Sequence, residues 1–187
     1  MQVLLARDRP AQPWKNGQGV TWQVAAAPAG AGLDHFDWRV SIAEISQDGA
    51  FSTFAGIDRT IAVIEGAGVT LTVDGVDHAL APYQPLEFAG EAETSCRLVE
   101  GTTRDLNLMT GRDRAHGSIE FLTVVGEVRV DARVLIIVNG NAQVCIGGEW
   151  ADLEAFDALL HDGAVSLTAE HAVVAVIRVQ SPFVSGS

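Results

Sequence analysis

The 187-residue sequence has little cysteine, almost no lysine and no long apolar segment. Its two cysteines, Cys96 and Cys145, both lie in apolar runs, so we interpret them as reduced core residues and not as a disulfide framework. No uninterrupted hydrophobic run reaches the roughly 20 residues of a membrane span. The N-terminal segment carries Arg7, Asp8 and Arg9 and lacks the apolar core of a secretory signal. We therefore expect a cytoplasmic protein.

Motifs for metal binding and for common catalytic chemistry are also missing. The five histidines are widely spaced, with no His-x-His or His-x3–5-His pair, and there is no Cys-x-x-Cys motif. This spacing argues against a preformed transition-metal site. There is likewise no Gly-x-Ser-x-Gly elbow, phosphate loop or dinucleotide fingerprint. We expect no metal and no cofactor, and the residues alone identify no catalytic group.

The charge is one-sided. Twenty-four acidic residues against twelve basic ones give a net charge of −12 and a pI near 4.6. Such a surface repels phosphate backbones and anionic lipids, so we expect neither nucleic-acid nor membrane partners. Lys15 is the single lysine, and the other eleven basic residues are arginines. An anionic ligand of so acidic a protein needs local positive charge, and individual arginines are its natural source.

Short runs of Val, Ile, Thr, Phe and Trp alternate with clusters of Gly, Asp, Asn and Pro along the whole chain. This pattern predicts an all-β sandwich or barrel. We expect strands at 36–45, 59–65, 69–73, 86–88, 95–99, 106–109, 119–125, 134–138, 142–146, 165–167 and 173–179, and at 20–25 near the N-terminus. The run Trp150–Leu160 has helical spacing, and it equally fits a turn followed by a strand.

The chain also contains a weak internal repeat. Ile61–Gly66 resembles Leu135–Gly140, 74 residues later, and each copy continues into a strand and a glycine turn. This repeat favours a duplicated β unit, two related barrels packed together, over one large sandwich. It also favours a turn and a strand over a helix in the second copy. We place the first barrel at residues 1–115 and the second at 116–187 of one unit, and leave open an exchange of strands between them.

The run Trp14–Thr21 places an aromatic ring, the lysine, an amide and two glycines directly before a predicted strand. Asn16-Gly17 is a strong turn signal, because both residues tolerate a positive φ. Gly19 allows the backbone to approach either a neighbouring chain segment or a ligand. Two interpretations stay open here: an ordinary hairpin with Trp14 packed beneath it, or the lip of a binding pocket.

Several predicted strands carry one apolar face and one face with a few polar residues. Arg39 and Ser41 share a face with Ala43 and Ile45, Asn107 shares one with Asp105 and Met109, and Thr21 lies opposite Val20 and Trp22. The polar faces are either the solvent side of a sheet or the inside of a barrel. Inside a barrel, these groups must be paired or must bind something polar, because unpaired burial is costly.

Asp58 and Arg59 form a second polar pair, at the start of a predicted strand. They are either surface charges with a weak salt bridge, or Arg59 is a fork that binds a carboxylate.

Four motifs resemble, in sequence and in order, the HutD/Ves family: Trp14–Thr21, Phe36–Ala43, Phe51–Arg59 and Asp105–Arg112. The resemblance covers roughly residues 3 to 180. It implies a bicupin fold, two jelly-roll-like barrels of the cupin superfamily, here without the histidines of metal-binding cupins. It also implies a link to histidine utilisation or, in the Ves branch, to environmental stress. Gln18 stands where the family usually has glycine, and Ala55 where it usually has proline.

The leading hypothesis is a metal-free cupin that binds formylglutamate or a related acidic intermediate of histidine degradation in a regulatory role. Arg39 and Arg59 would bind carboxylates, and Asn16 and Asn107 would orient amide or formyl groups. Asp58 would orient an arginine, while Trp14 and Met109 would cover the apolar part of the ligand. The complete predicted site is Trp14, Asn16, Gly17, Arg39, Ser41, Asp58, Arg59, Asn107 and Met109.

Two alternatives remain. The first is a metal-independent isomerase or hydrolase that acts on a similar acid, with Asp58, Asp105 or His116 as acid or base. The second is a stress-related interaction protein whose polar faces are exposed. The sequence leaves the oligomeric state open, a homodimer included.

Overall fold

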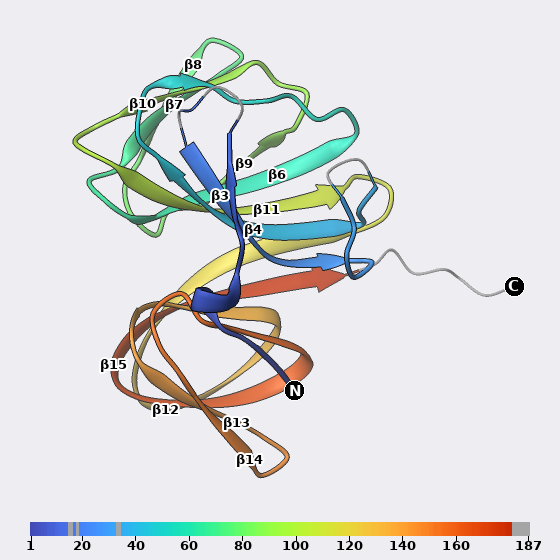
Figure 1. Cartoon of the computed structure of the whole chain (residues 1–187), viewed down its shortest axis with the longest axis vertical. Helices are drawn as coiled ribbons and strands as arrows, with labels where there is room; N and C mark the ends of the chain where they lie inside the picture. The colour runs from blue at the N-terminus through green and yellow to red at the C-terminus, as the bar shows by residue number, and fades with distance from the viewer. Residues whose placement is uncertain (15–16, 18, 33–34, 181–187) are drawn as a thin grey trace, which may run out of the picture. The chain divides into compact units, whose positions relative to one another are not determined.

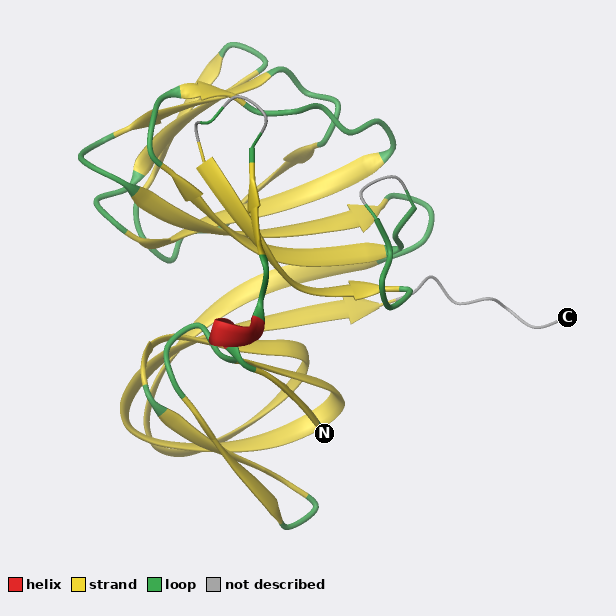
Figure 2. Ribbon diagram, viewed as in Figure 1, coloured by secondary structure: helices red, strands yellow, loops and turns green. Residues whose placement is uncertain are grey.

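The chain folds almost entirely into strands, as Figure 2 shows for its computed structural model. The structure describes residues 1–14, 17, 19–32 and 35–180. Within these residues, the one helical segment is the short 3-10 turn η1 (Ala6–Asp8). The strands are β1 (Gln2–Leu4), β2 (Ala11–Pro13), β3 (Gly19–Ala27), β4 (Trp38–Ile45), β5 (Gly49–Ala50), β6 (Ile57–Glu65), β7 (Val69–Val73), β8 (Val76–Leu80), β9 (Leu86–Ala89), β10 (Thr94–Leu98), β11 (Thr103–Gly111), β12 (His116–Gly140), β13 (Ala142–Ile146), β14 (Glu149–Leu153) and β15 (Ala158–Gln180). The all-β prediction is confirmed.

The chain divides into two compact units. The smaller unit combines Met1–Arg9 with Gly117–Val179, and the larger one is formed mainly by Pro10–His116. The strands of each unit can be followed by colour in Figure 1.

The larger unit contains two antiparallel sheets. One has the order β2-β3-β4-β11-β6-β9 and the other the order β5-β10-β7-β8. Ile45, Ile61 and Val63 of the first sheet form one buried cluster with Leu71 and Cys96 of the second. The two sheets therefore pack face to face around a shared core, which is how alternating strands bury their apolar side.

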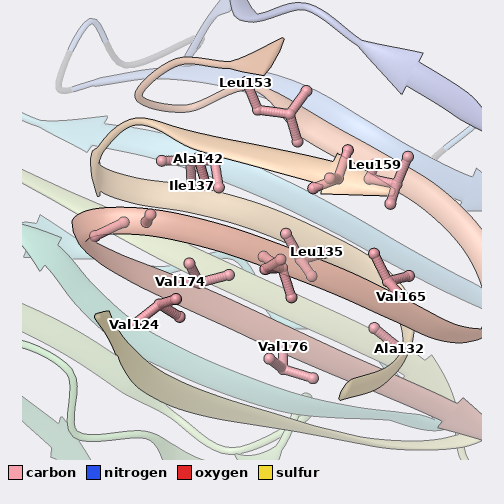
Figure 3. Close-up of a cluster of buried hydrophobic side chains, with 14 residues drawn as sticks. Val124, Ala132, Leu135, Ile137, Ala142, Leu153, Leu159, Val165, Val174 and Val176 are labelled. Atoms are coloured by element: carbon pink, nitrogen blue, oxygen red, sulfur yellow. The ribbon is translucent and has the colours of Figure 1, made fainter. Parts of the chain in front are cut away.

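The smaller unit is a single sheet with the order β1-β15-β13-β14, and β12 also pairs with β15. Its core is rich in branched aliphatic residues from the two long strands β12 and β15. Figure 3 shows the buried side chains of this core, among them Leu135, Val165 and Val174. Leu153 and Leu159 are 0% and 1% exposed and belong to the same cluster.

The two long strands differ from the prediction. Four separate short runs were expected at 119–125, 134–138, 165–167 and 173–179, but the structure joins them pairwise into β12 and β15. Gly126 and Gly163 lie between the expected runs, and they take φ values of 80° and 119° inside strands that continue through them. Glycine in a strand accommodates such a local irregularity without ending the pairing.

The ambiguous run Trp150–Leu160 forms a strand, a turn and the start of another strand. β14 ends at Leu153, and β15 begins at Ala158. The turn between them places Phe156 at a φ of 68°. The helical spacing in this run is therefore incidental.

No helix in the described part of the chain is long and apolar enough to cross a membrane.

Candidate functional site

Three neighbouring strands bring most of the predicted polar residues onto one face of the six-stranded sheet. In the antiparallel register, Met109 on the central strand β11 lies opposite Arg39 on β4 and opposite Arg59 on β6. Residues paired in this way point to the same face of the sheet. Asp105 and Asn107 follow on that face of β11. We call the four polar residues Arg39, Arg59, Asp105 and Asn107 the arginine site.

This face is the interior of the larger unit. Asn107 lies opposite Ile61 and Asp105 lies opposite Val63, and both aliphatic residues belong to the core between the two sheets. Arg39 and Arg59 are each 5% exposed. The alternative in which the polar faces are solvent faces is therefore wrong for these strands. The sequence hint was the continuation of the Arg39 face into apolar residues.

Arg39 is held by two neutral side chains. Its Nε donates to Gln23 Oε1 at 2.9 Å, and its Nη1 donates to Ser41 Oγ at 3.3 Å. Neither partner neutralises the guanidinium, and burial lowers the pKa of Arg39 below its ordinary value. A guanidinium carries five N–H donors, so the two bonds leave three donors without a partner in the described part of the chain.

Arg59 is held mainly by aromatic rings. Its Cζ lies 5.3 Å from the ring centre of Phe51, 5.7 Å from that of Phe54 and 5.1 Å from that of Phe88. Such contacts favour a cation over the ring faces. The only hydrogen bond that Arg59 donates to a described residue is a long one, 3.5 Å from Nη1 to the carbonyl oxygen of Ser52. Its buried Nε has no partner among the described residues.

Burial dominates the electrostatics of the site. It lowers the pKa of Arg59 to about 10, opposed by the attraction of Asp105 and assisted by the repulsion of Arg39. It raises the pKa of Asp105 to about 7, although Arg59 acts in the opposite direction. Asn107 adds a buried Oδ1 that accepts no hydrogen bond from the described residues. The site thus combines two cations, a carboxyl that titrates near neutrality and an unused acceptor.

Two guanidiniums with unused donors suit carboxylate ligands. Neither Arg39 nor Arg59 forms an ion pair with a carboxylate in the described part of the chain. Charge-assisted bonds from a guanidinium fork to a carboxylate are among the strongest hydrogen bonds in proteins. A dicarboxylic acid with an N–H donor would satisfy both arginines and Asn107 Oδ1.

The predicted lip packs close to Arg59 through one aromatic contact. Trp14 and Phe51 meet edge to face, with ring centres 6.3 Å apart, and Phe51 in turn lies beside Arg59. Trp14 Nε1 donates to Thr21 Oγ1 at 2.8 Å, which ties the ring across the hairpin of β2 and β3. Gly17 takes a φ of 72° in the turn. Asn16, Lys15 and Gln18 lie outside the described residues.

Gly19 answers one question left open by the sequence. A Cβ at this position would lie 2.5 Å from the carbonyl oxygen of Glu44 and 3.0 Å from the Trp14 ring. The close approach that Gly19 permits is therefore to the neighbouring strand β4 and to Trp14.

Asp58 does not join the arginine site. It accepts a hydrogen bond at 2.9 Å from Nε of Arg112, which also pairs with Glu91 at 2.8 Å. Successive strand residues point to opposite faces, so Asp58 and Arg59 diverge. Asp58 does orient an arginine, but that arginine is Arg112 on the partly exposed side. Ser41 and Met109, 2% exposed each, line the same face as the arginines.

Sequence reasoning missed the residues that hold the two arginines. Gln23, which accepts a hydrogen bond from Arg39, is not among the predicted site residues. The three phenylalanines around Arg59 come from the segment before β6 and from β9. The clustering of aromatic residues near Arg59 in the sequence was a usable signal for two of them, Phe51 and Phe54. Phe88 could be found only through the pairing of β6 with β9.

A groove in the smaller unit is chemically different from the arginine site. It has a volume of about 460 Å³ and is lined by Asp152, Glu154 and Glu170 among other residues. Its acidic side chains repel an anionic ligand. In the described residues, no group of three or more His, Cys, Asp or Glu side chains is arranged to hold a metal ion.

A family profile described as HutD matches residues 6–176 of the chain. An uncharacterized 21.2 kDa protein of the hutC 3' region of Pseudomonas putida is 36% identical over 167 residues, 87% of each chain. Protein Ves of Citrobacter koseri is 38% identical over 121 residues, 64% of this chain and 62% of Ves.

Solved structures agree with this relationship. The structure of HutD from Pseudomonas fluorescens SBW25, in a formate condition, is 38% identical, has a TM-score of 0.81 and aligns over 97% of this chain and 99% of its own. A cupin 2 conserved barrel domain protein from Leptotrichia buccalis has a TM-score of 0.62 at 8% identity over 96% of each chain, which shows a cupin-like fold alone.

Proposed function

Because the chain belongs to the HutD family, we propose that it binds a small acidic metabolite at the arginine site. One observation carries the proposal. Arg39 and Arg59 are both 5% exposed, and neither pairs with a carboxylate of the described residues. Burying cations without an ion-pair partner is costly, and a bound carboxylate would supply that partner.

The ligand that fits the site chemistry best is formylglutamate or a related intermediate of histidine degradation. Its two carboxylates would each bind one guanidinium, and its amide N–H would donate to Asn107 Oδ1. Trp14 and Met109 would cover the methylene chain, while the backbone of Gly17 would face the ligand from the turn. The hut-region name of the Pseudomonas putida relative and the HutD name of the solved structure support this pathway.

The role that we propose is regulatory: a cytoplasmic, metal-free protein that responds to the level of this intermediate. We also propose that the two units are the duplicated barrels of a bicupin. The hairpin of β7 and β8 and that of β13 and β14 support the duplication, because all four strands have five residues. Moreover, β13 and β14 begin 73 residues after β7 and β8, at 142 against 69 and at 149 against 76.

One observation favours a second candidate, a metal-independent enzyme acting on a similar acid. The pKa of Asp105 is raised to about 7, which suits a general acid or base at neutral pH. The candidate predicts a new product from N-formylglutamate that disappears in an Asp105→Asn variant and persists with a chelator. Binding without turnover would eliminate it.

Titration calorimetry tests the binding function. We expect saturable heat with N-formylglutamate, less affinity for glutamate and least for urocanate, which has one carboxylate. An Arg39→Gln variant should lose at least tenfold in affinity, since it loses the charge-assisted bonds. An Arg97→Gln variant is the matched control, because Arg97 is exposed and pairs with Asp77 on the surface. Absence of heat with all three acids at millimolar concentration would refute the proposal.

A further inference from the structure

Asp105 is the one carboxyl group of the arginine site, and the groups around it influence whether it is ionised. It is 3% exposed on the inner face of β11. The groups that act on it come from several elements. Arg59 on β6 attracts it, and Arg39 on β4 acts on Arg59. On the opposite sheet, Cys96 of β10 lies near enough for Asp105 and Asp48 to influence its thiol.

Cys96, the titratable neighbour on β10, stays neutral. Burial, with Asp105 and Asp48, raises the pKa of Cys96 to about 12. The facing positions on β3, Thr21 and Gln23, carry no charge. Within the arginine site, Arg39, Arg59 and Asp105 contribute two positive charges when Asp105 is protonated, and one when it is ionised. On the opposite sheet, His78 of β8 is in register with Leu71 and shares its inner face.

We propose that Asp105 selects the charge of the ligand, and that the site takes up a dianion together with one proton from solvent. The proposal rests on the binding function argued above. With Asp105 ionised, a dianion would leave one uncompensated negative charge in the buried site, which is unfavourable. A proton on the Asp105 carboxylate forms an O–H bond and restores neutrality. That proton returns to solvent when the ligand leaves.

A monoanion behaves differently at the same site. Two arginines, an ionised Asp105 and one ligand carboxylate already sum to zero charge. A monoanionic ligand is therefore bound above neutral pH without a proton. The pKa of Asp105 is raised to about 7 without ligand, so the difference in proton uptake between a dianion and a monoanion falls within the physiological pH range. The carboxylates of a bound ligand raise the pKa of Asp105 further, because like charges disfavour ionisation.

The test compares N-formylglutamate, a dianion, with N-formylglutamine, a monoanion of nearly the same shape. Calorimetry at pH 8 in HEPES and in Tris separates binding heat from the heat of proton exchange with the buffer. We expect uptake of close to one proton with N-formylglutamate and close to none with N-formylglutamine. The affinity for N-formylglutamate should fall by up to about tenfold per pH unit above pH 7, as one-proton linkage requires.

An Asp105→Asn variant should bind N-formylglutamate without proton uptake and with the same affinity at pH 6.5 and 8.5. Asp77→Asn is the control, since Asp77 pairs with Arg97 on the exposed side of β8 and should leave the uptake unchanged. Dianion binding without proton uptake by the wild-type protein would overturn the proposal and leave the binding function intact. If neither compound binds, the binding function fails as well. The wild-type comparison decides the matter even if the Asn variant does not fold.

Discussion

Arg59 is positioned by three phenylalanine rings and one long hydrogen bond, so its guanidinium is fixed while its Nε keeps no partner among the described residues. Arg39 is positioned by Gln23 and Ser41, which orient it without neutralising it. In both cases the supporting groups leave the positive charge in place. At the scale of single residues, this is what makes the arginine site suitable for an anion.

The fork geometry of Arg59 should matter as much as its charge. In an Arg59→Lys variant the charge is kept, but the planar donors that can bind a carboxylate in a bidentate manner are lost. We expect N-formylglutamate affinity to fall about 10- to 100-fold, the equivalent of roughly one to two charge-assisted hydrogen bonds. Calorimetry measures this, with Arg97→Lys as control. Equal affinities for Arg59→Lys and wild type would show that Arg59 does not bind the ligand.

Asp105 should make the ligand-free protein less stable as pH rises. Its pKa is raised to about 7 in the folded state, so the unfolded chain releases the proton first, above an ordinary pKa near 3.8. The stability that the folded protein gains from holding this proton is complete below pH 3.8 and is lost as pH rises to 7. Asp105→Asn should therefore match the wild type near pH 4 and exceed its unfolding free energy at pH 8 by on the order of 2–4 kcal/mol. Urea unfolding at both pH values measures the difference, and a constant difference would contradict the pKa.

At the scale of elements, the alternation of strand residues predicted that Arg39 shares a face with Ser41 and that Asn107 shares one with Met109. It left open whether these faces point to solvent or to the interior, which only the burial in the structure decides. The register that sets Met109 between Arg39 and Arg59 could not be predicted, because it depends on long-range pairing of β11 with β4 and β6. Alternation also separates Asp58 from Arg59, although adjacency in sequence suggested that they act together. The long strands β12 and β15 were hidden because glycines inside strands resemble turn signals.

Asp157 ties the N-terminal segment to the turn before β15. Its Oδ1 accepts from the Ala6 backbone N–H at 2.7 Å, and its Oδ2 accepts from that of Glu154 at 3.1 Å. Asp157→Ala should lower the unfolding free energy by about 1–3 kcal/mol, since two backbone N–H donors lose their buried acceptor. Asp152→Ala, at an exposed position, should change it by less than about 0.5 kcal/mol. Denaturant unfolding of both variants checks this, and equal stabilities would contradict the role of Asp157.

Gly19 is required by close packing between β3 and β4. A methyl group there would meet the carbonyl oxygen of Glu44 at 2.5 Å and the Trp14 ring at 3.0 Å. Gly19→Ala should cost about 1–3 kcal/mol through overpacking. Gly32→Ala is the control, because its Cβ would meet no atom within 4 Å. Thermal unfolding compares the two, and an unaltered midpoint for Gly19→Ala would show that the strands can separate at no cost.

At the scale of the whole molecule, a chain with a net charge of −12 keeps two arginines inside its larger unit. The overall charge disfavours anionic partners in general, so the binding of an acidic metabolite depends on the local field of the arginine site. The composition predicted that the overall charge disfavours anionic partners. The positions of individual arginines in the sequence predicted a local site of positive charge. The ligand itself could not be derived from composition, because several small acids share the same groups.

A crystal structure of the protein with N-formylglutamate tests the central claim most directly. The account predicts one ligand carboxylate within about 2.7–2.9 Å of a nitrogen of Arg59 and the other at a similar distance from Arg39, as charge-assisted bonds require. It also predicts that the ligand N–H donates to Asn107 Oδ1. A ligand bound elsewhere, with both guanidiniums still lacking a carboxylate partner, would contradict it.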